Sequence, residues 1–105
     1  MDMPLSQTER SLIRRELVEL LCHEPEVRRL VIFGSFASGG APRDLDVAVF
    51  QDSRHSYLTL ARKYRRLLRP LARRIPLDVL PLRASAPPGW FVRDEVLRGE
   101  VIYER

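Results

Sequence analysis

The stretch VIFGSFASGGAPRDLDVAVF, residues 31–50, decides how this sequence is interpreted. An apolar run ends at Gly34 and Ser35, a loop of small residues follows, and a second apolar run is entered through two acids, Asp44 and Asp46. Short apolar runs bounded by glycine and polar residues predict buried strands. Carboxylates are out of place in a segment that otherwise has the pattern of a buried strand, so their position needs an explanation.

The spacing of the two acids suits one face of a strand. Residues i and i+2 of a strand point to the same side, with Cα atoms about 6.5 Å apart. Asp44 and Asp46 are therefore predicted to be neighbours, while Leu45 and Val47 point to the core. Carboxylates this close repel each other unless a cation holds them, and a pair of Mg²⁺ ions, as in phosphoryl-transfer sites, supplies that charge. The motif alone leaves a plainer alternative open, in which Asp44 is a turn residue and Asp46 an ordinary exposed strand position.

The loop before the acids has the composition of an anion-binding turn. Gly34 follows the first strand, and the small residues after it are Ser35, Ala37, Ser38, Gly39 and Gly40. Their backbone amides can approach a phosphate closely, and the Ser35 hydroxyl can donate a hydrogen bond to it. No Lys-Ser or Lys-Thr pair follows Gly40, which excludes a Walker loop. Arg43 adds positive charge beside the acids, either as a phosphate ligand or as a solvated loop residue.

The N-terminal part of the chain has two helical patterns. Ser6 and Glu9 fit a capping box, and the apolar spacing after them predicts a helix from residue 6 to about residue 23. A second helix is predicted over residues 53–73, kinked or broken by Pro70.

The C-terminal part returns to strands. A strand is predicted over residues 76–82 with Asp78 in its middle, then a short helix over 91–98 closed by Gly99, and a last strand over 101–103. Together with the two strands around the Gly-Ser loop, this alternation predicts one sheet with helices packed on it, an α/β or α+β fold.

Composition restricts the class of protein. With 105 residues, 45% of them hydrophobic, the chain is predicted to form a single domain over residues 1–105. The one cysteine, Cys22, cannot form an internal disulfide and is expected in the core, so a reducing, cytoplasmic setting is expected. No apolar run reaches the roughly 18 residues that cross a membrane.

Side chains outside the central stretch are expected to be structural. Tyr57 and Tyr64 lie on the apolar stripe of the second helix and are predicted to be core residues. His23 and His55 have no second ligand at metal spacing and are predicted at the surface. The arginine-rich run 62–74 is a solvated helix face or, as the alternative, a surface for an acidic partner or RNA.

Several motifs together carry a resemblance. FGS at residues 33–35, the small-residue loop, DLDVAV at 44–49 and LDVLPL at 77–82 resemble the nucleotidyltransferase fold of the DNA polymerase beta superfamily, specifically its minimal nucleotidyltransferases of the MntA antitoxin type. The similarity extends from the leading helix to the tail FVRDEVLRGEVIYE, residues 91–104. It implies a small mixed β-sheet of about four strands with helices packed on it.

The resemblance also implies a role for each site residue. Gly34 and Ser35 match the Gly-Ser pair that holds the triphosphate of ATP. Asp44 and Asp46 match the paired metal ligands, and Asp78 matches the third carboxylate, which completes the metal site and can take the proton from the attacking hydroxyl. Two Mg²⁺ ions neutralise the triphosphate while the hydroxyl attacks the α-phosphorus in line.

The implied activity is transfer of AMP from ATP to a hydroxyl group of a partner protein. In MntA-type systems the acceptor is a tyrosine of a HEPN-domain toxin, so the resemblance implies an antitoxin that requires neither nucleic acid nor a membrane. A chain of this size has no room for a separate acceptor-binding domain, so a second chain presents the acceptor or a homo-oligomer builds the pocket.

The loop departs from the family pattern. Eight residues separate Ser35 from Asp44, fewer than is usual in these enzymes, and Phe36 and Ser38 stand where basic residues are common. This departure motivates an alternative, an antitoxin with a weak or inactive site that neutralises its toxin by binding only. A small-molecule nucleotidyltransferase of the aminoglycoside-modifying kind is a third reading, disfavoured by the lack of an acceptor-binding domain.

Overall fold

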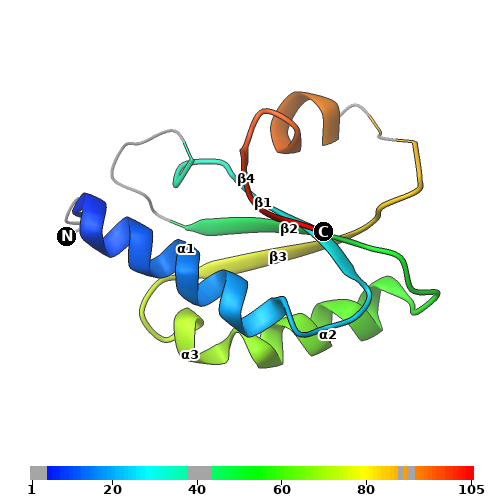
Figure 1. Cartoon of the computed structure of the whole chain (residues 1–105), viewed down its shortest axis with the longest axis horizontal. Helices are drawn as coiled ribbons and strands as arrows, with labels where there is room; N and C mark the ends of the chain where they lie inside the picture. Colours follow the sequence, from blue (N-terminus) through cyan, green and yellow to red (C-terminus); the bar gives the residue numbers. More distant parts are fainter. Residues whose placement is uncertain (1–4, 38–43, 88, 90–91) are drawn as a thin grey trace.

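The computed structural model describes residues 5–37, 44–87, 89 and 92–105. Its strands are β1 (Val27–Phe33), β2 (Leu45–Gln51), β3 (Leu77–Arg83) and β4 (Glu100–Glu104). They form one four-stranded sheet in the order β3-β2-β1-β4 (Figure 1). β1 runs antiparallel to β2 and to β4, whereas β2 and β3 are parallel. The predicted α/β fold with a small mixed sheet is confirmed.

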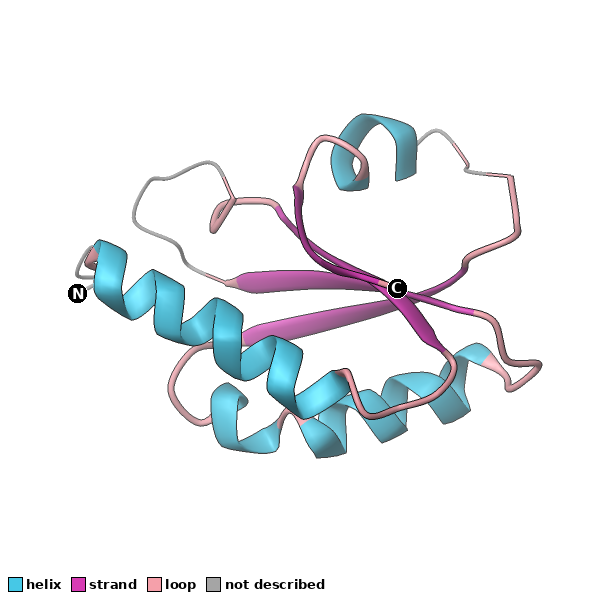
Figure 2. Cartoon of the chain, in the orientation of Figure 1, coloured by secondary structure: helices cyan, strands magenta, loops and turns pink. Residues whose placement is uncertain are grey.

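The helices divide unequally between the two faces of this sheet. They are α1 (Gln7–Leu21), α2 (Tyr57–Leu67), α3 (Arg69–Ala72) and the single-turn π-helix η1 (Val92–Val96). The helices α1, α2 and α3 lie on one side of the strands, here called the helix face, and η1 lies on the other, here called the open face (Figure 2). No helix of the described residues is long and apolar enough to cross a membrane.

Each face has its own apolar cluster. The cluster of the helix face is large, and its fully buried members include Leu17, Leu21, Leu30, Ile32, Leu45, Val47, Val49, Tyr64 and Leu68. Within the described part of the chain, the buried members of the open-face cluster are Val31, Ala48 and Val96, and the apolar residues around them are only partly buried. Among the described residues, the helix face therefore holds most of the core, and fewer side chains cover the open face.

The helix boundaries follow from local chemistry. The backbone N–H of Glu9 donates to Ser6 Oγ and the Ser6 N–H donates to Glu9 Oε1, each at 3.1 Å, which confirms the capping box of α1. A second hydroxyl, that of Ser56, accepts from the Thr59 N–H at 3.2 Å and caps α2. The predicted break at Pro70 is confirmed, because α2 ends at Leu67 and the proline lies in the first turn of α3.

The predicted start of the second helix at residue 53 is wrong. Ser53 donates from its backbone N–H and its hydroxyl to Gln51 Oε1, at 2.6 and 2.5 Å, and so belongs to the turn after β2. As a result Tyr57 is the first residue of α2 and is 51% exposed, not part of the core as predicted. Its place on the buried face is taken by Leu60, while Tyr64 is fully buried as predicted.

Two further predictions need correction at the ends of elements. Cys22 is the C-cap of α1 and is half-buried rather than a core thiol. The helix predicted over residues 91–98 is a π-helix at Val92–Val96, and its predicted first residue, Phe91, lies outside the described residues. The surface positions predicted for His23 and His55 are confirmed.

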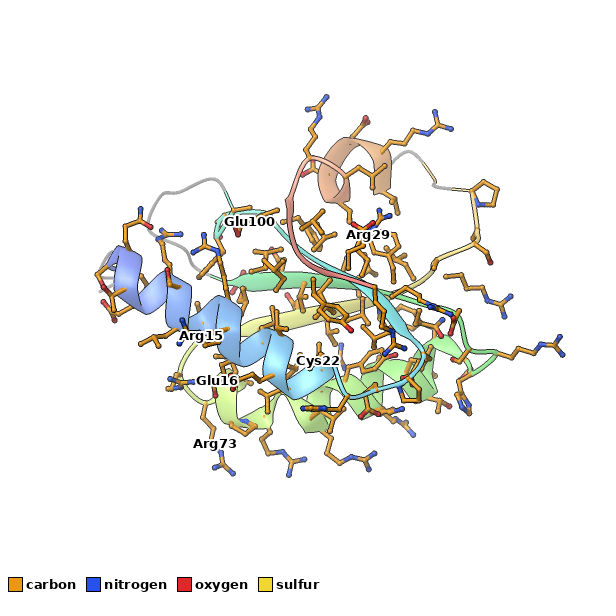
Figure 3. All side chains as sticks on the ribbon, in the orientation of Figure 1. Arg15, Glu16, Cys22, Arg29, Arg73 and Glu100 are labelled. Atoms are coloured by element: carbon orange, nitrogen blue, oxygen red, sulfur yellow. The ribbon has the colours of Figure 1, made fainter. Side chains whose placement is uncertain are left out.

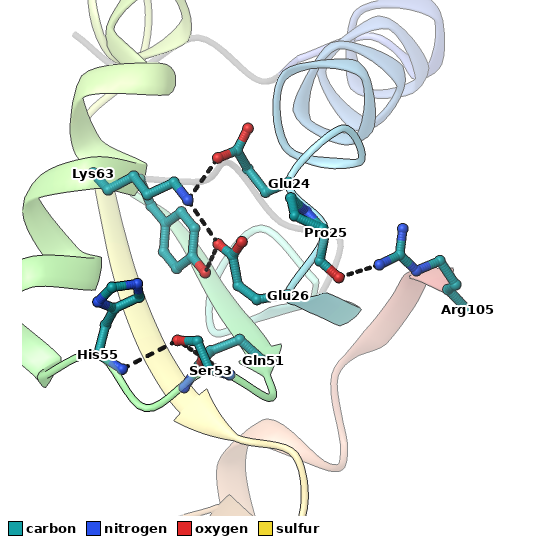
Figure 4. A network of polar contacts seen from close by, with 9 residues as sticks. Glu24, Pro25, Glu26, Gln51, Ser53, His55, Lys63 and Arg105 are labelled. Carbon is teal, nitrogen blue, oxygen red and sulfur yellow. Dashed lines mark hydrogen bonds and ion pairs between the residues drawn. The ribbon is translucent and has the colours of Figure 1, made fainter.

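An ionic network on the helix face joins α2 to the turn before β1 (Figure 4). Glu26, 9% exposed, accepts hydrogen bonds from Tyr64 Oη at 2.9 Å and from Lys63 Nζ at 3.0 Å. The same ammonium group lies 2.7 Å from Glu24 Oε1. Burial acts to raise the pKa of Glu26, but hydrogen bonds from the backbone, Lys63 and Tyr64 outweigh it and leave this pKa below its ordinary value. The network therefore favours the ionised carboxylate.

Candidate active site

Three strand ends bring the predicted site residues together. Along β2, the side chains that alternate with the core residues point to the open face, and Asp46 is one of them. The parallel register of β2 and β3 sets Asp78 directly opposite it. The antiparallel register of β1 and β2 sets Phe33 opposite Asp46, so the next residue, Gly34, lies against the Asp46 carboxylate. The site thus lies where β1 ends and where β2 and β3 begin.

Gly34 has a specific steric and conformational role. Its φ is 74°, in the left-handed region that residues with a Cβ rarely adopt. A Cβ built at this position would lie 2.5 Å from Asp46 Oδ2, far inside van der Waals contact. Glycine was predicted here because it allows a close approach of the backbone to a phosphate. The structure adds a second reason, since glycine leaves room for the acid itself.

The Asp46 carboxylate is the electrostatic centre of the site. Its side chain is half-buried, whereas Asp44 and Asp78 are exposed. Burial, then the negative charge of Asp78 and then that of Asp44, raise the pKa of Asp46 above its ordinary value. The charges of Asp78 and Asp44 therefore act on the Asp46 carboxylate, and this repulsion is relieved by adding a proton or a cation.

Asp44 lies at the end of the loop that leads into β2. It lies directly before β2, and its backbone carbonyl accepts a hydrogen bond from the Ser35 hydroxyl at 3.4 Å. Ser35 lies at the start of the loop and Asp44 at its end, so this hydrogen bond joins the two ends of the loop. Arg43 and residues 38–42 lie outside the described residues.

The donor set fits Mg²⁺ by its chemistry. Carboxylate oxygens are the ligands that Mg²⁺ prefers, usually one or two from the protein with the rest from phosphates and water. Asp46 and Asp78 supply such a pair from adjacent strands, with Asp44 beside them. Within the described part of the chain, the acids are not drawn together into a ready-made set of three ligands. These acids therefore suit a metal ion that is also bound by a phosphate ligand, and not one that is enclosed by protein ligands alone.

Phe36 anchors the loop to α1, which sequence reasoning missed. Its ring is fully buried, and the guanidinium groups of Arg10 and Arg14 lie 5.0 and 5.5 Å from the ring centroid. Arg10 also donates from Nη1 to the Phe36 carbonyl at 2.9 Å. The signal in the sequence was a single aromatic residue among small ones, which is typical of a loop that is fixed to the core at one point. The loop therefore starts from a fixed position close to Gly34.

Arg98 is a second residue that the sequence did not single out. It lines a cavity of about 330 Å³ with Gly34, Ala37, Asp94, Glu95 and Gly99. Among the described residues of this lining Arg98 is the one cation, and it comes from the turn between η1 and β4. Gly99 lets this turn approach β1, because a Cβ on it would lie 2.3 Å from the Ile32 carbonyl oxygen. The described lining thus holds one positive and two negative side chains in the same cavity as the glycine at which a phosphate is expected.

The sequence was also compared with known proteins. A family model described as Polymerase beta, Nucleotidyltransferase matches residues 15–105. The matched range begins within α1 and includes all the strands named above and every predicted site residue. No curated protein matches the chain significantly.

Proposed function

The chain belongs to the polymerase beta nucleotidyltransferase family, and we propose that it transfers AMP from ATP to a hydroxyl group of a partner protein. The family match supports nucleotidyl transfer as the reaction class. The observation that carries the residue assignment is the register of β2 and β3, which sets Asp46 beside Asp78 on the open face with Gly34 against the first of them. Nothing in the packing of the helix face explains why two acids are paired there.

The proposed roles divide between phosphate binding and proton transfer. The backbone N–H groups after Gly34, the Ser35 hydroxyl and Arg43 bind the phosphates of ATP. Asp44, Asp46 and Asp78 would hold Mg²⁺, which when bound supplies positive charge to the triphosphate. Exposure of Asp78 leaves its carboxylate free to accept the proton of the attacking hydroxyl.

The proposed reaction balances as a single displacement. The acceptor oxygen forms a bond to the α-phosphorus of ATP, and the bond from this phosphorus to the oxygen that bridges to the β-phosphorus breaks. Pyrophosphate leaves with that oxygen, and the hydroxyl proton passes to Asp78. The acceptor retains AMP as a phosphodiester.

The acceptor in this proposal comes from another chain. Asp46 and Asp78 open to the side of the sheet where η1 is the one described helix, and η1 contacts β1. Among the described elements, none covers the part of the open face above β2 and β3, where the proposed acceptor would approach. By resemblance to minimal nucleotidyltransferases, we propose a tyrosine of a HEPN-domain toxin as the acceptor and an antitoxin role for this protein.

Transfer of labelled nucleotide tests the proposal. The protein is incubated with ATP labelled at the α-phosphate, Mg²⁺ and the product of the adjacent gene, and the label on that product is measured. We expect labelling by the native protein and by Asp52→Asn, and none by Asp46→Asn. Asp52 is a matched control because it directly follows β2, about 20 Å along the strand from Asp46. Equal labelling by native protein and Asp46→Asn contradicts the site assignment.

A binding-only antitoxin is the second candidate, and the short loop favours it. Eight residues separate Ser35 from Asp44, and Phe36 among them is fixed under α1. The two candidates differ in a cellular assay of toxin neutralisation. If Asp44→Asn/Asp46→Asn neutralises as well as the native protein, binding alone is sufficient. Loss of neutralisation by this variant, with complex formation retained, supports transfer.

A further inference from the structure

The charge of this protein is concentrated in one segment. Residues 53–76 contain eight of the 18 basic residues and none of the 14 acidic ones. This segment therefore carries a formal charge of +8, and the remainder of the chain carries −4. A solvated helix surface normally mixes both signs, so this separation exceeds what solubility requires.

The segment forms α2 and α3 and presents its arginines to solvent. An arginine stripe runs along these helices, and all of its members are exposed: Arg62, Arg65, Arg66, Arg69 and Arg73. They alternate with buried Tyr64, Leu68 and Leu71, which point into the core. In Figure 3, Arg73 extends from the lower edge of the molecule, away from the sheet. The stripe thus lies on the solvent-facing side of α2 and α3.

Within the described residues, no member of the arginine stripe forms an ion pair. Two neighbouring basic residues do form ion pairs. Lys63 on α2 pairs with Glu24 and Glu26, and Arg74 in the turn after α3 pairs with Glu16. Like charges three and four residues apart on a helix repel each other. The stripe therefore disfavours its own helices until an anion neutralises it.

We propose that the arginine stripe binds the phosphate backbone of a nucleic-acid duplex. Guanidinium groups bind phosphates in a bidentate geometry, and a row of them neutralises a polyanion without reading its sequence. A protein partner would require apolar anchors at the centre of its interface, and a single strand would require exposed aromatic rings. The exposed large apolar side chains of this segment are Tyr57 and Leu58, which lie at the start of α2 and before the stripe. The stripe itself therefore has neither the apolar anchors of a protein interface nor the aromatic rings of a single-strand site.

This surface is separate from the candidate active site. The arginine stripe lies on the outer side of the helix layer, and Asp46 and Asp78 lie on the open face, across the sheet. The proposed transfer to a protein does not require nucleic acid. Duplex binding is therefore a further property, and its test does not depend on the transfer reaction.

Fluorescence anisotropy with a short labelled DNA duplex tests the proposal. With five phosphate contacts, the logarithm of the association constant is expected to fall with the logarithm of salt concentration at a slope of about −4 to −5. Arg62→Gln/Arg66→Gln is expected to reduce this slope by about 2 and to weaken binding about tenfold at about 0.1 M salt. Both substitutions keep good helix formers at exposed positions, and a thermal melt checks that the fold is retained.

The matched control is Arg83→Gln/Arg93→Gln, which removes the same charge from exposed positions outside the stripe. It is expected to bind within about twofold of the native protein. If the control loses as much affinity as the stripe variant, attraction is due to net charge alone and the proposal is overturned. Tighter binding of single-stranded DNA than of duplex also overturns the proposal and assigns the stripe to a single strand. Binding of polyglutamate without binding of duplex overturns it as well and assigns the stripe to an acidic protein.

Discussion

Glu26 on the helix face and Asp46 on the open face are both shielded acids, yet their pKa values move in opposite directions. Glu26 has a lysine and a tyrosine as hydrogen-bond donors, so its pKa is lowered despite burial. Asp46 has Asp78 and Asp44 as neighbours, so burial and repulsion both raise its pKa. The negative charge of Glu26 is stabilised by hydrogen-bond donors within the chain, whereas that of Asp46 requires a proton or an external cation.

This difference separates stability from chemistry. The helix face combines the large apolar cluster with a compensated ionic network, which is how a fold is stabilised. On the open face, burial and the charges of Asp78 and Asp44 act against the Asp46 carboxylate, which costs stability. Perturbed carboxylates that do not help the fold are typical of functional sites. Substitutions on the two faces should therefore affect different properties.

The largest effect is expected from Asp46→Asn. Nucleotidyl transfer should fall about a thousandfold, equivalent to about 4 kcal/mol in the barrier, because the charge that holds the metal is lost. Stability should stay equal or rise, because a repelled charge is removed. Transfer kinetics and urea unfolding of the same variant measure the two quantities. A variant that is both inactive and strongly destabilised would break the separation between the faces.

A matched pair of leucines compares packing on the two faces. Leu21→Ala on the helix face should lower the free energy of unfolding by about 3 kcal/mol, because it leaves a cavity among fully buried side chains. Leu80→Ala on the open face should cost about 1 kcal/mol, because its side chain is only partly buried. Urea unfolding measures both. Equal losses would show that the open face is as well packed as the helix face.

Gly34→Ala is expected to have an intermediate effect that involves both properties. The left-handed backbone and the 2.5 Å approach to Asp46 Oδ2 should cost about 1 to 2 kcal/mol in stability. Transfer should also fall, because the new methyl group displaces the Asp46 carboxylate. Gly89→Ala is the control, since its Cβ would meet no atom of the described residues within 4 Å, chain neighbours aside. Equal behaviour of the two variants would remove the steric role assigned to Gly34.

The smallest effects are expected from pH. The pKa of Glu26 is lowered in the folded state, so its contribution is present above the ordinary glutamate pKa and is lost as pH falls through the folded value. Glu26→Gln should therefore flatten the loss of stability in acid. The pKa of Asp46 is raised, so its ionisation destabilises the fold as pH rises above the ordinary aspartate pKa. Asp46→Asn should remove this opposite slope, and unfolding curves measured across the acid range compare the two variants. Identical pH profiles would contradict the opposite signs.

Much of the fold could be predicted because its signals are local. The capping box at Ser6 and Glu9, the break at Pro70 and the short apolar runs each depend on residues close in sequence. The start of α2 was predicted too early, because the Ser53 hydroxyl bonds to Gln51 instead of capping the helix. Whether Ser53 or Ser56 caps the helix depends on the Gln51 side chain at the end of β2. The apolar periodicity of the sequence contains no information about that side chain.

The candidate site could be predicted only in part, for a similar reason. Gly34, Asp46 and Asp78 were identified from motifs, and the registers of the strands place them together. The burial of Phe36 under Arg10 depends on a contact across 26 residues, and Arg98 lines a cavity with Gly34, which is far from it in sequence. Neither arrangement leaves a periodic pattern in the sequence. Residues that support or border the site were therefore missed, while those in its motifs were found.

Binding of a paramagnetic metal tests the central claim most directly. Mn²⁺ is titrated into the isotopically labelled protein with a non-hydrolysable ATP analogue, and the broadening of each backbone amide signal is followed by NMR. We predict that the signals of Gly34, Asp46 and Asp78 broaden first in the native protein and that Asp46→Asn abolishes this effect. First broadening at Glu100 or Glu104 on β4, or unchanged broadening in Asp46→Asn, would contradict the assignment of the open-face acids as the metal and nucleotide site.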